Sequence, residues 1–152
     1  MKITAQDIKK LREETGAGVM DCKQALTQAK GVYAKAKEYV IERGLAKAKK
    51  KANREVKEGA IAQYVHATGK TGALVELLCE TDFVARNNEF LALSHDLAMQ
   101  VVAMNPATLE ELMKQDFIKD PGVTVEKTVM QLSGKIGEKL ALTRFVRYQL
   151  GE

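Results

Sequence analysis

The stretch Glu76-Leu77-Leu78-Cys79-Glu80-Thr81-Asp82-Phe83-Val84-Ala85-Arg86-Asn87 joins two different sequence patterns. Up to position 80, apolar residues alternate in phase from Ala73 to Cys79, which predicts a strand. From Asn88 onward apolar residues recur at helical spacing and predict a helix that runs to about Met104. Between the two, Thr81 and Asp82 carry short polar side chains that can cap a helix. We therefore place the centre of the fold at this strand-to-helix junction.

Phe83 and Val84 form an apolar pair at the tip of the expected turn. One interpretation is that Phe83 folds back and anchors the core, as a hydrophobic staple does. The other is that Phe83 projects as a wedge for a partner, with Asp82 fixing the turn beneath it. The pattern of residues does not separate these two interpretations.

The main domain is expected over residues 59–152. Residues 60–66 and 73–80 read as two strands of a hairpin, and residues 140–150 alternate as a last strand. Between them we expect the helix from Asn88, with Phe90, Leu91, Leu97, Ala98 and Val101 on its apolar face, a turn at residues 120–122, and further helices. This order predicts an α+β domain, a small antiparallel sheet of about three strands packed with helices.

Two leucines, Leu74 and Leu78, would lie on the second face of this sheet. That face is covered either by the chain's own tail or by a second copy of the chain.

Residues 1–44 predict a small N-terminal module of three short helices separated by glycines. The second of these helices is expected to place Met20, Cys22, Ala25, Leu26 and Ala29 inward, and the third to stop at Gly44. The tight turn over residues 15–18 leaves Val19 at a corner, where Val19 and Met20 are either core residues or a contact surface.

Residues 45–58 are rich in lysine, have high helix propensity and lack an apolar face, which predicts an exposed helical or frayed linker. The alternative is a nucleic-acid-binding patch. The segment contains no aromatic residue on which a base could stack, which favours the linker.

The composition favours a binding protein over an enzyme. The 152 residues carry a net charge of only +4, and the apolar runs are too short to span a bilayer, so we expect a cytoplasmic protein without a membrane partner. Cys22 and Cys79 lack metal-ligand spacing, and neither His66 nor His95 has a nucleophile at triad spacing. We therefore expect no enzymatic activity, cofactor or bound metal.

The run from Glu76 to Asn87 resembles the core signature of the elongation factor Ts family. A second run, Leu11-Arg12-Glu13-Glu14-Thr15-Gly16-Ala17-Gly18-Val19-Met20-Asp21-Cys22-Lys23-Gln24-Ala25-Leu26, resembles the family's N-terminal motif. The resemblance implies a UBA-like N-terminal module and a guanine nucleotide exchange factor for the translation GTPase elongation factor Tu, in both its GDP-bound and its nucleotide-free form. The alternative function is a basic nucleic-acid-binding translation accessory protein; the exchange-factor reading implies no specific nucleic acid as partner.

The resemblance also implies which residues make contact with the GTPase. The segment Thr81-Asp82-Phe83-Val84 would enter beside the Mg²⁺ site and dislodge the metal. Further contacts would come from Val19, Met20, Lys23, Arg86, Asn87, Ile136 and Gly137. The family's contacts also include the segment that matches Lys135-Ile136-Gly137-Glu138. The family usually has Asn next, whereas this chain has Lys139. Family members usually carry two copies of the core unit, so with one copy here a homodimer is expected to replace the second.

Overall fold

The computed structural model describes residues 2–152; Met1, which the expected N-terminal module includes, lies outside this range. Its elements follow in chain order as α1 (Ala5–Thr15), α2 (Val19–Gln28), α3 (Tyr33–Lys50), β1 (Glu58–Val65), β2 (Thr71–Cys79), α4 (Asp82–Ala85), α5 (Asn88–Met104), α6 (Leu109–Lys114), β3 (Asp116–Phe117), β4 (Asp120–Thr124), α7 (Val125–Ile136) and β5 (Ala141–Gln149). The predicted α+β class is confirmed.

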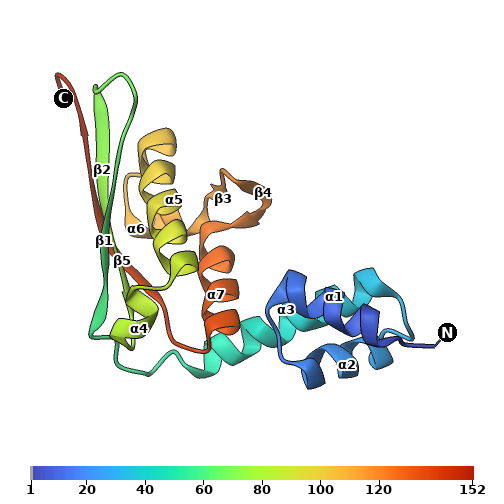
Figure 1. Ribbon diagram of the computed structural model, residues 1–152. Coiled ribbons are helices and arrows are strands. Elements are labelled where there is room, and N and C mark those ends of the chain that lie inside the picture. Colours follow the sequence, from blue (N-terminus) through green and yellow to red (C-terminus); the bar gives the residue numbers. More distant parts are fainter. Residues whose placement is uncertain (1) are drawn as a thin grey trace.

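The sheet has three antiparallel strands in the order β1-β2-β5, as predicted. Helix α5 runs along one face of this sheet (Figure 1). Alternate residues of β2 point into the core, where Val75 and Leu77 pack with Phe90, Leu97 and Val101 of α5. Leu91, expected on the buried face of α5, is instead exposed, so that part of the prediction was wrong.

A second, smaller hairpin pairs β3 with β4 next to α7. The sequence predicted only a turn at Asp120–Gly122, but these residues belong to β4 and the reversal occurs at residues 118–119. Pro121 is tolerated there because a strand of a two-stranded hairpin has a free edge.

The three N-terminal helices enclose a separate core built around Leu11, Cys22 and Leu26. Met20 was expected inside this core, but 63% of its surface is exposed, so that expectation was wrong. Helix α3 does not stop at Gly44 either; it continues to Lys50 and packs along α7 (Figure 1). The first part of the expected linker is therefore helical, and Ala48 within it is buried.

Within residues 2–152, no helix is both long enough and apolar enough to span a bilayer.

Candidate functional site

The junction between β2 and α5 contains two capped helix starts. Thr81 caps the short helix α4, its hydroxyl accepting a hydrogen bond from the Val84 N–H at 3.4 Å. Asn87 caps α5, its side-chain oxygen accepting from the N–H groups of Glu89 at 2.8 Å and Phe90 at 3.2 Å. The strand therefore reverses into the long helix through a single turn of helix, which carries Phe83.

Phe83 is 77% exposed, so the interpretation that it anchors the core was wrong. The aromatic residue that fills the core at this end of α5 is Phe90, which is fully buried. Arg86 lies over the Phe83 ring, with its guanidinium carbon 5.7 Å from the ring centre, and also pairs with Asp82 at 3.0 Å. The Phe83 ring is thus exposed beside the Arg86 guanidinium, whose charge is paired with Asp82.

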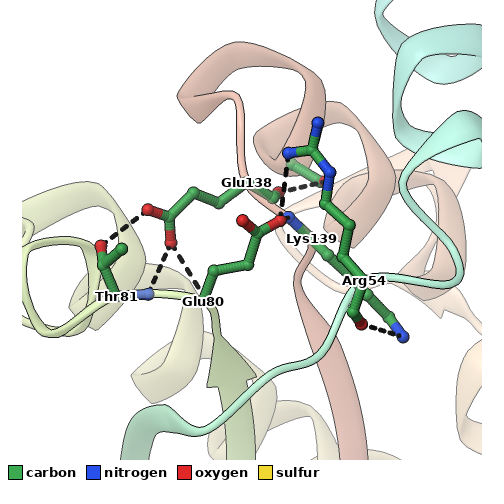
Figure 2. Close-up of polar contacts among 6 residues, drawn as sticks. Arg54, Glu80, Thr81, Glu138 and Lys139 are labelled. Carbon is green, nitrogen blue, oxygen red and sulfur yellow. Dashed lines mark hydrogen bonds and ion pairs between the residues drawn. The ribbon is translucent and has the colours of Figure 1, made fainter.

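Glu138 connects this turn to the end of α7. One oxygen of its carboxylate accepts from the N–H groups of Glu80 and Thr81, at 3.1 and 3.0 Å, and the other accepts from the Thr81 hydroxyl at 2.6 Å (Figure 2). Glu80 in turn accepts from the Lys139 N–H at 2.8 Å and from Arg54 at 3.3 Å, and the Lys139 ammonium donates to the Arg54 carbonyl at 3.2 Å (Figure 2). The hydrogen bond from Lys139 keeps the pKa of Glu80 below its usual value.

The structure places the expected contact residues Ile136 and Gly137 at the same end of the molecule as α4. Ile136 is half-buried against the core, and Gly137 ends α7 in the left-handed conformation, with φ of 88°. Glu138, which follows this turn, belongs to the segment that was expected to contact the GTPase, but its bonds to the Thr81 turn were not predicted. Nothing in the sequence pairs it with Thr81, because the two residues are 57 positions apart.

Val19, Met20 and Lys23 form a second exposed surface, on α2. Their exposure excludes the interpretation that Val19 and Met20 are core residues. This surface does not adjoin Phe83: α2 and α4 lie well apart in Figure 1, with α7 between them in that view. The predicted contact residues therefore fall on two surfaces, one on each part of the chain.

The two cysteines are buried thiols, as their apolar phase predicts. Burial raises the pKa of Cys79 to about 11, and the neighbouring Glu138 carboxylate shifts it in the same direction. The Cys79 thiol donates to the Thr81 carbonyl at 3.1 Å, directly below the exposed turn. In the part of the chain that the structure describes, no cluster of three or more His, Cys, Asp or Glu side chains could hold a metal ion.

Comparison with known proteins gives a consistent result. A family model described as Elongation factor TS matches residues 80–152, the part that holds α4, α7 and β5. Proteins named Elongation factor Ts from Fervidobacterium nodosum and Pseudothermotoga lettingae are 42% and 41% identical, each alignment covering 100% of both chains. One from Aquifex aeolicus is 45% identical over 97% of this chain and 53% of its own length. The chain belongs to the elongation factor Ts family of translation elongation factors.

Proposed function

We propose that this protein is a guanine nucleotide exchange factor for elongation factor Tu and promotes GDP release by inserting Phe83 beside the Mg²⁺ and phosphate site of the GTPase. The observation that carries the proposal is the exposure of the Phe83 ring in a capped turn of a family signature. A large apolar ring held in water at the tip of a turn gains free energy when a partner buries it.

Nucleotide exchange requires no catalytic group, because no covalent bond is made or broken. It requires tighter binding to the nucleotide-free GTPase than to the GDP-bound form. By linkage, the factor by which the exchange protein lowers the affinity for GDP is the factor by which GDP lowers the affinity for the exchange protein. A GTPase that binds GDP with nanomolar affinity holds it with about 12 kcal/mol. A buried aromatic hot spot contributes about 2 to 4 kcal/mol against this.

The metal is the most effective target for such a wedge. In GTPases Mg²⁺ bridges the phosphates and is held by hydroxyl and carboxylate groups, so its loss removes a large part of the nucleotide's electrostatic binding. We infer that Thr81, Asp82, Phe83 and Val84 enter next to this site, while Arg86 and Asn87 contact its rim. Arg86, now stacked on Phe83 and paired with Asp82, would release the ring as it inserts.

A second contact completes the proposed interface. Val19, Met20 and Lys23 on α2 would bind a separate part of the GTPase, and Ile136 and Gly137 would support the contact beside α4. Two separated surfaces on one protein fix the orientation of the partner, which a single loop cannot do, and raise the effective concentration of the Phe83 turn at its target.

We also propose a homodimer, formed through the open face of the sheet. Leu74 lies at the middle of this face, with Gln63 of β1 and Val146 of β5 opposite it. Large apolar side chains on this face remain exposed, and they are Ile61, Val65, Leu74, Val146 and Tyr148. A second copy fits this patch, because two identical apolar faces are complementary about a twofold axis.

The test is release of fluorescent GDP from purified elongation factor Tu. Phe83→Ala should fold normally, since the ring is outside the core, and slow stimulated release by about 10- to 100-fold. Met104→Ala, which truncates another exposed apolar side chain at the far end of α5, is the matched control and should change nothing. An unchanged rate with Phe83→Ala would reject the wedge.

The alternative function, nucleic-acid binding, depends on the basic segment from Lys47 to Lys57, in which Lys47, Lys49 and Lys50 are exposed at the end of α3. It predicts RNA affinity that falls steeply with salt and no effect on GDP release. The same preparation tested with RNA and with the GTPase distinguishes the two functions.

A further inference from the structure

We propose that Glu138 is a positioning residue that fixes the Thr81–Val84 turn, so that the Phe83 ring is held in one outward orientation before any partner is bound. The inference rests on the exchange function proposed above and adds to it a residue that does not itself need to touch the GTPase. It is carried by the contacts between the end of α7 and the start of α4.

Helix α4 cannot hold its own shape. It has only four residues, none of them buried, and a helix this short does not form the hydrogen bonds needed to offset nucleation. The direction of Phe83 therefore depends on how the start of α4 is anchored. Val84 and Ala85 are half-buried against the core and anchor the inner side of the turn. The polar anchors lie at its start, at Thr81.

Glu138 supplies acceptors for three donors at this point. Its carboxylate binds the N–H groups of Glu80 and Thr81 and the Thr81 hydroxyl, the last at 2.6 Å (Figure 2). Because the hydroxyl proton is directed to Glu138, the oxygen's lone pairs are free to accept from Val84 N–H and so to cap α4. Hydrogen bonds to an ionised carboxylate are stronger than neutral ones, which suits an anchor for an exposed turn.

The position of Glu138 is itself fixed on both sides. The Ser133 hydroxyl donates to the Glu138 carbonyl at 2.6 Å, and the left-handed Gly137 turns the chain out of α7. On the other side, the Glu80 carboxylate accepts from the N–H of Lys139. The pair Glu80–Thr81 and the pair Glu138–Lys139 therefore each donate backbone N–H groups to a carboxylate of the other pair. The turn that carries Phe83 is therefore tied to α7 and not merely to its own strand.

A purely structural role for Glu138 would make a different prediction from a positioning role. If Glu138 only stabilised the fold, its removal would lower global stability, and its effect on GDP release would add to that of Phe83→Ala. If Glu138 acts through the Phe83 ring, its removal matters only while the ring is present, so the two substitutions are not additive.

The first measurement is amide hydrogen exchange by NMR on the protein alone. Glu138→Ala should increase exchange at the Glu80, Thr81 and Val84 amides by at least about tenfold. The first two amides lose their acceptor, and the Thr81 hydroxyl that accepts from Val84 loses the bond that holds it in place. The amides of Val75 and Leu77 in β2 should keep their protection. Unchanged exchange at Thr81 and Val84 would overturn the proposal. Glu126→Ala, which removes an exposed carboxylate from α7, the helix that precedes Glu138, is the control and should leave all five amides unaffected.

The second measurement is GDP release from elongation factor Tu. Glu138→Ala should slow release by about tenfold, and the double variant with Phe83→Ala should be no slower than Phe83→Ala alone. Glu138→Gln keeps one acceptor oxygen and should restore part of the rate. Multiplicative effects in the double variant would overturn the proposal. If Phe83→Ala by itself leaves release unchanged, the wedge function fails, and the amide measurement alone then decides whether Glu138 holds the turn.

Discussion

Phe83 and Phe90 are seven positions apart and have opposite environments, one exposed and one fully buried. Phe83 lies in the signature at residues 76–87 and Phe90 in the helix that follows it, and the sequence left open whether Phe83 also faces inward. The difference arises because Phe90 follows the Asn87 cap and lies on the inner face of α5, whereas Phe83 lies in a single turn whose inner position is taken by Val84. Phe83 is exposed because it lies between two helix caps, Thr81 at the start of α4 and Asn87 at the start of α5.

Cys79 gives a prediction at the scale of a single residue. With its pKa raised to about 11, only about one molecule in a thousand carries the thiolate at pH 8. For an unfolded cysteine, whose pKa is about 9, about one molecule in ten carries the thiolate at this pH. In a Cys22→Ala background, a thiol reagent at pH 8 should therefore react with the native protein at least about 100-fold more slowly than in urea. Equal rates in the two states would contradict this.

The raised pKa of Cys79 also makes the stability of the protein depend on pH. The native pKa lies above the unfolded one, so between about pH 9 and 11 the unfolded chain loses the proton first. The contribution of this thiol to stability is constant below about pH 9 and decreases as the pH rises through that window.

Among the elements, α3 and α7 lie very close to each other where Gly44 meets Gly134. A Cβ added at Gly134 would lie 2.6 Å from the carbonyl oxygen of Gly44, a backbone atom that cannot move without shifting α3. A Cβ added at Gly44 would meet nothing within 4 Å. The contact between α3 and α7 thus requires glycine at position 134 but not at position 44. This contact joins the N-terminal helices to the main domain.

We expect Gly134→Ala to lower the free energy of unfolding by about 1 to 3 kcal/mol, because the helices must separate. Gly44→Ala should instead raise it by about 0.5 to 1 kcal/mol, because alanine loses less conformational entropy in a helix than glycine. Urea unfolding of both variants measures the difference. Destabilisation by both, or by neither, would show that the two helices do not pack as described.

Strand β5 contains a β-bulge that the alternation of apolar residues did not predict. The sequence pattern predicts that every second residue from 140 to 150 faces the same side of the sheet. Instead, the neighbouring residues Thr143 and Arg144 are both exposed, and the register shifts beside Glu76. Both side chains bind the Glu76 carboxylate, at 2.8 Å and 3.0 Å. This bulge reverses the phase, so that Leu142 faces the core while Val146 faces the open side of the sheet.

At the scale of the whole molecule, the open face of the sheet predicts the oligomeric state. The protein should elute at micromolar concentration with twice the chain mass of 16.8 kDa by light scattering. Leu74→Lys should give a monomer, because the dimer would bury an unpaired charge at the centre of the face. Met104→Lys, on the helix that covers the opposite face, should remain dimeric. A monomeric wild-type protein would reject the homodimer.

The sequence by itself determined the three strands of the main sheet, the long helix after the junction, the capping role of Thr81, the α+β class and, through two long motifs, membership of the family. These depend on periodicity and on hydrogen bonds between residues a few positions apart. Only the tertiary structure decided that Phe83 points outward, that Glu138 binds Thr81 across 57 positions, and that Gly134 lies against Gly44. Such contacts depend on how α3, α7 and the sheet pack against one another, and that packing is set by the summed burial of the whole chain, which no local pattern records.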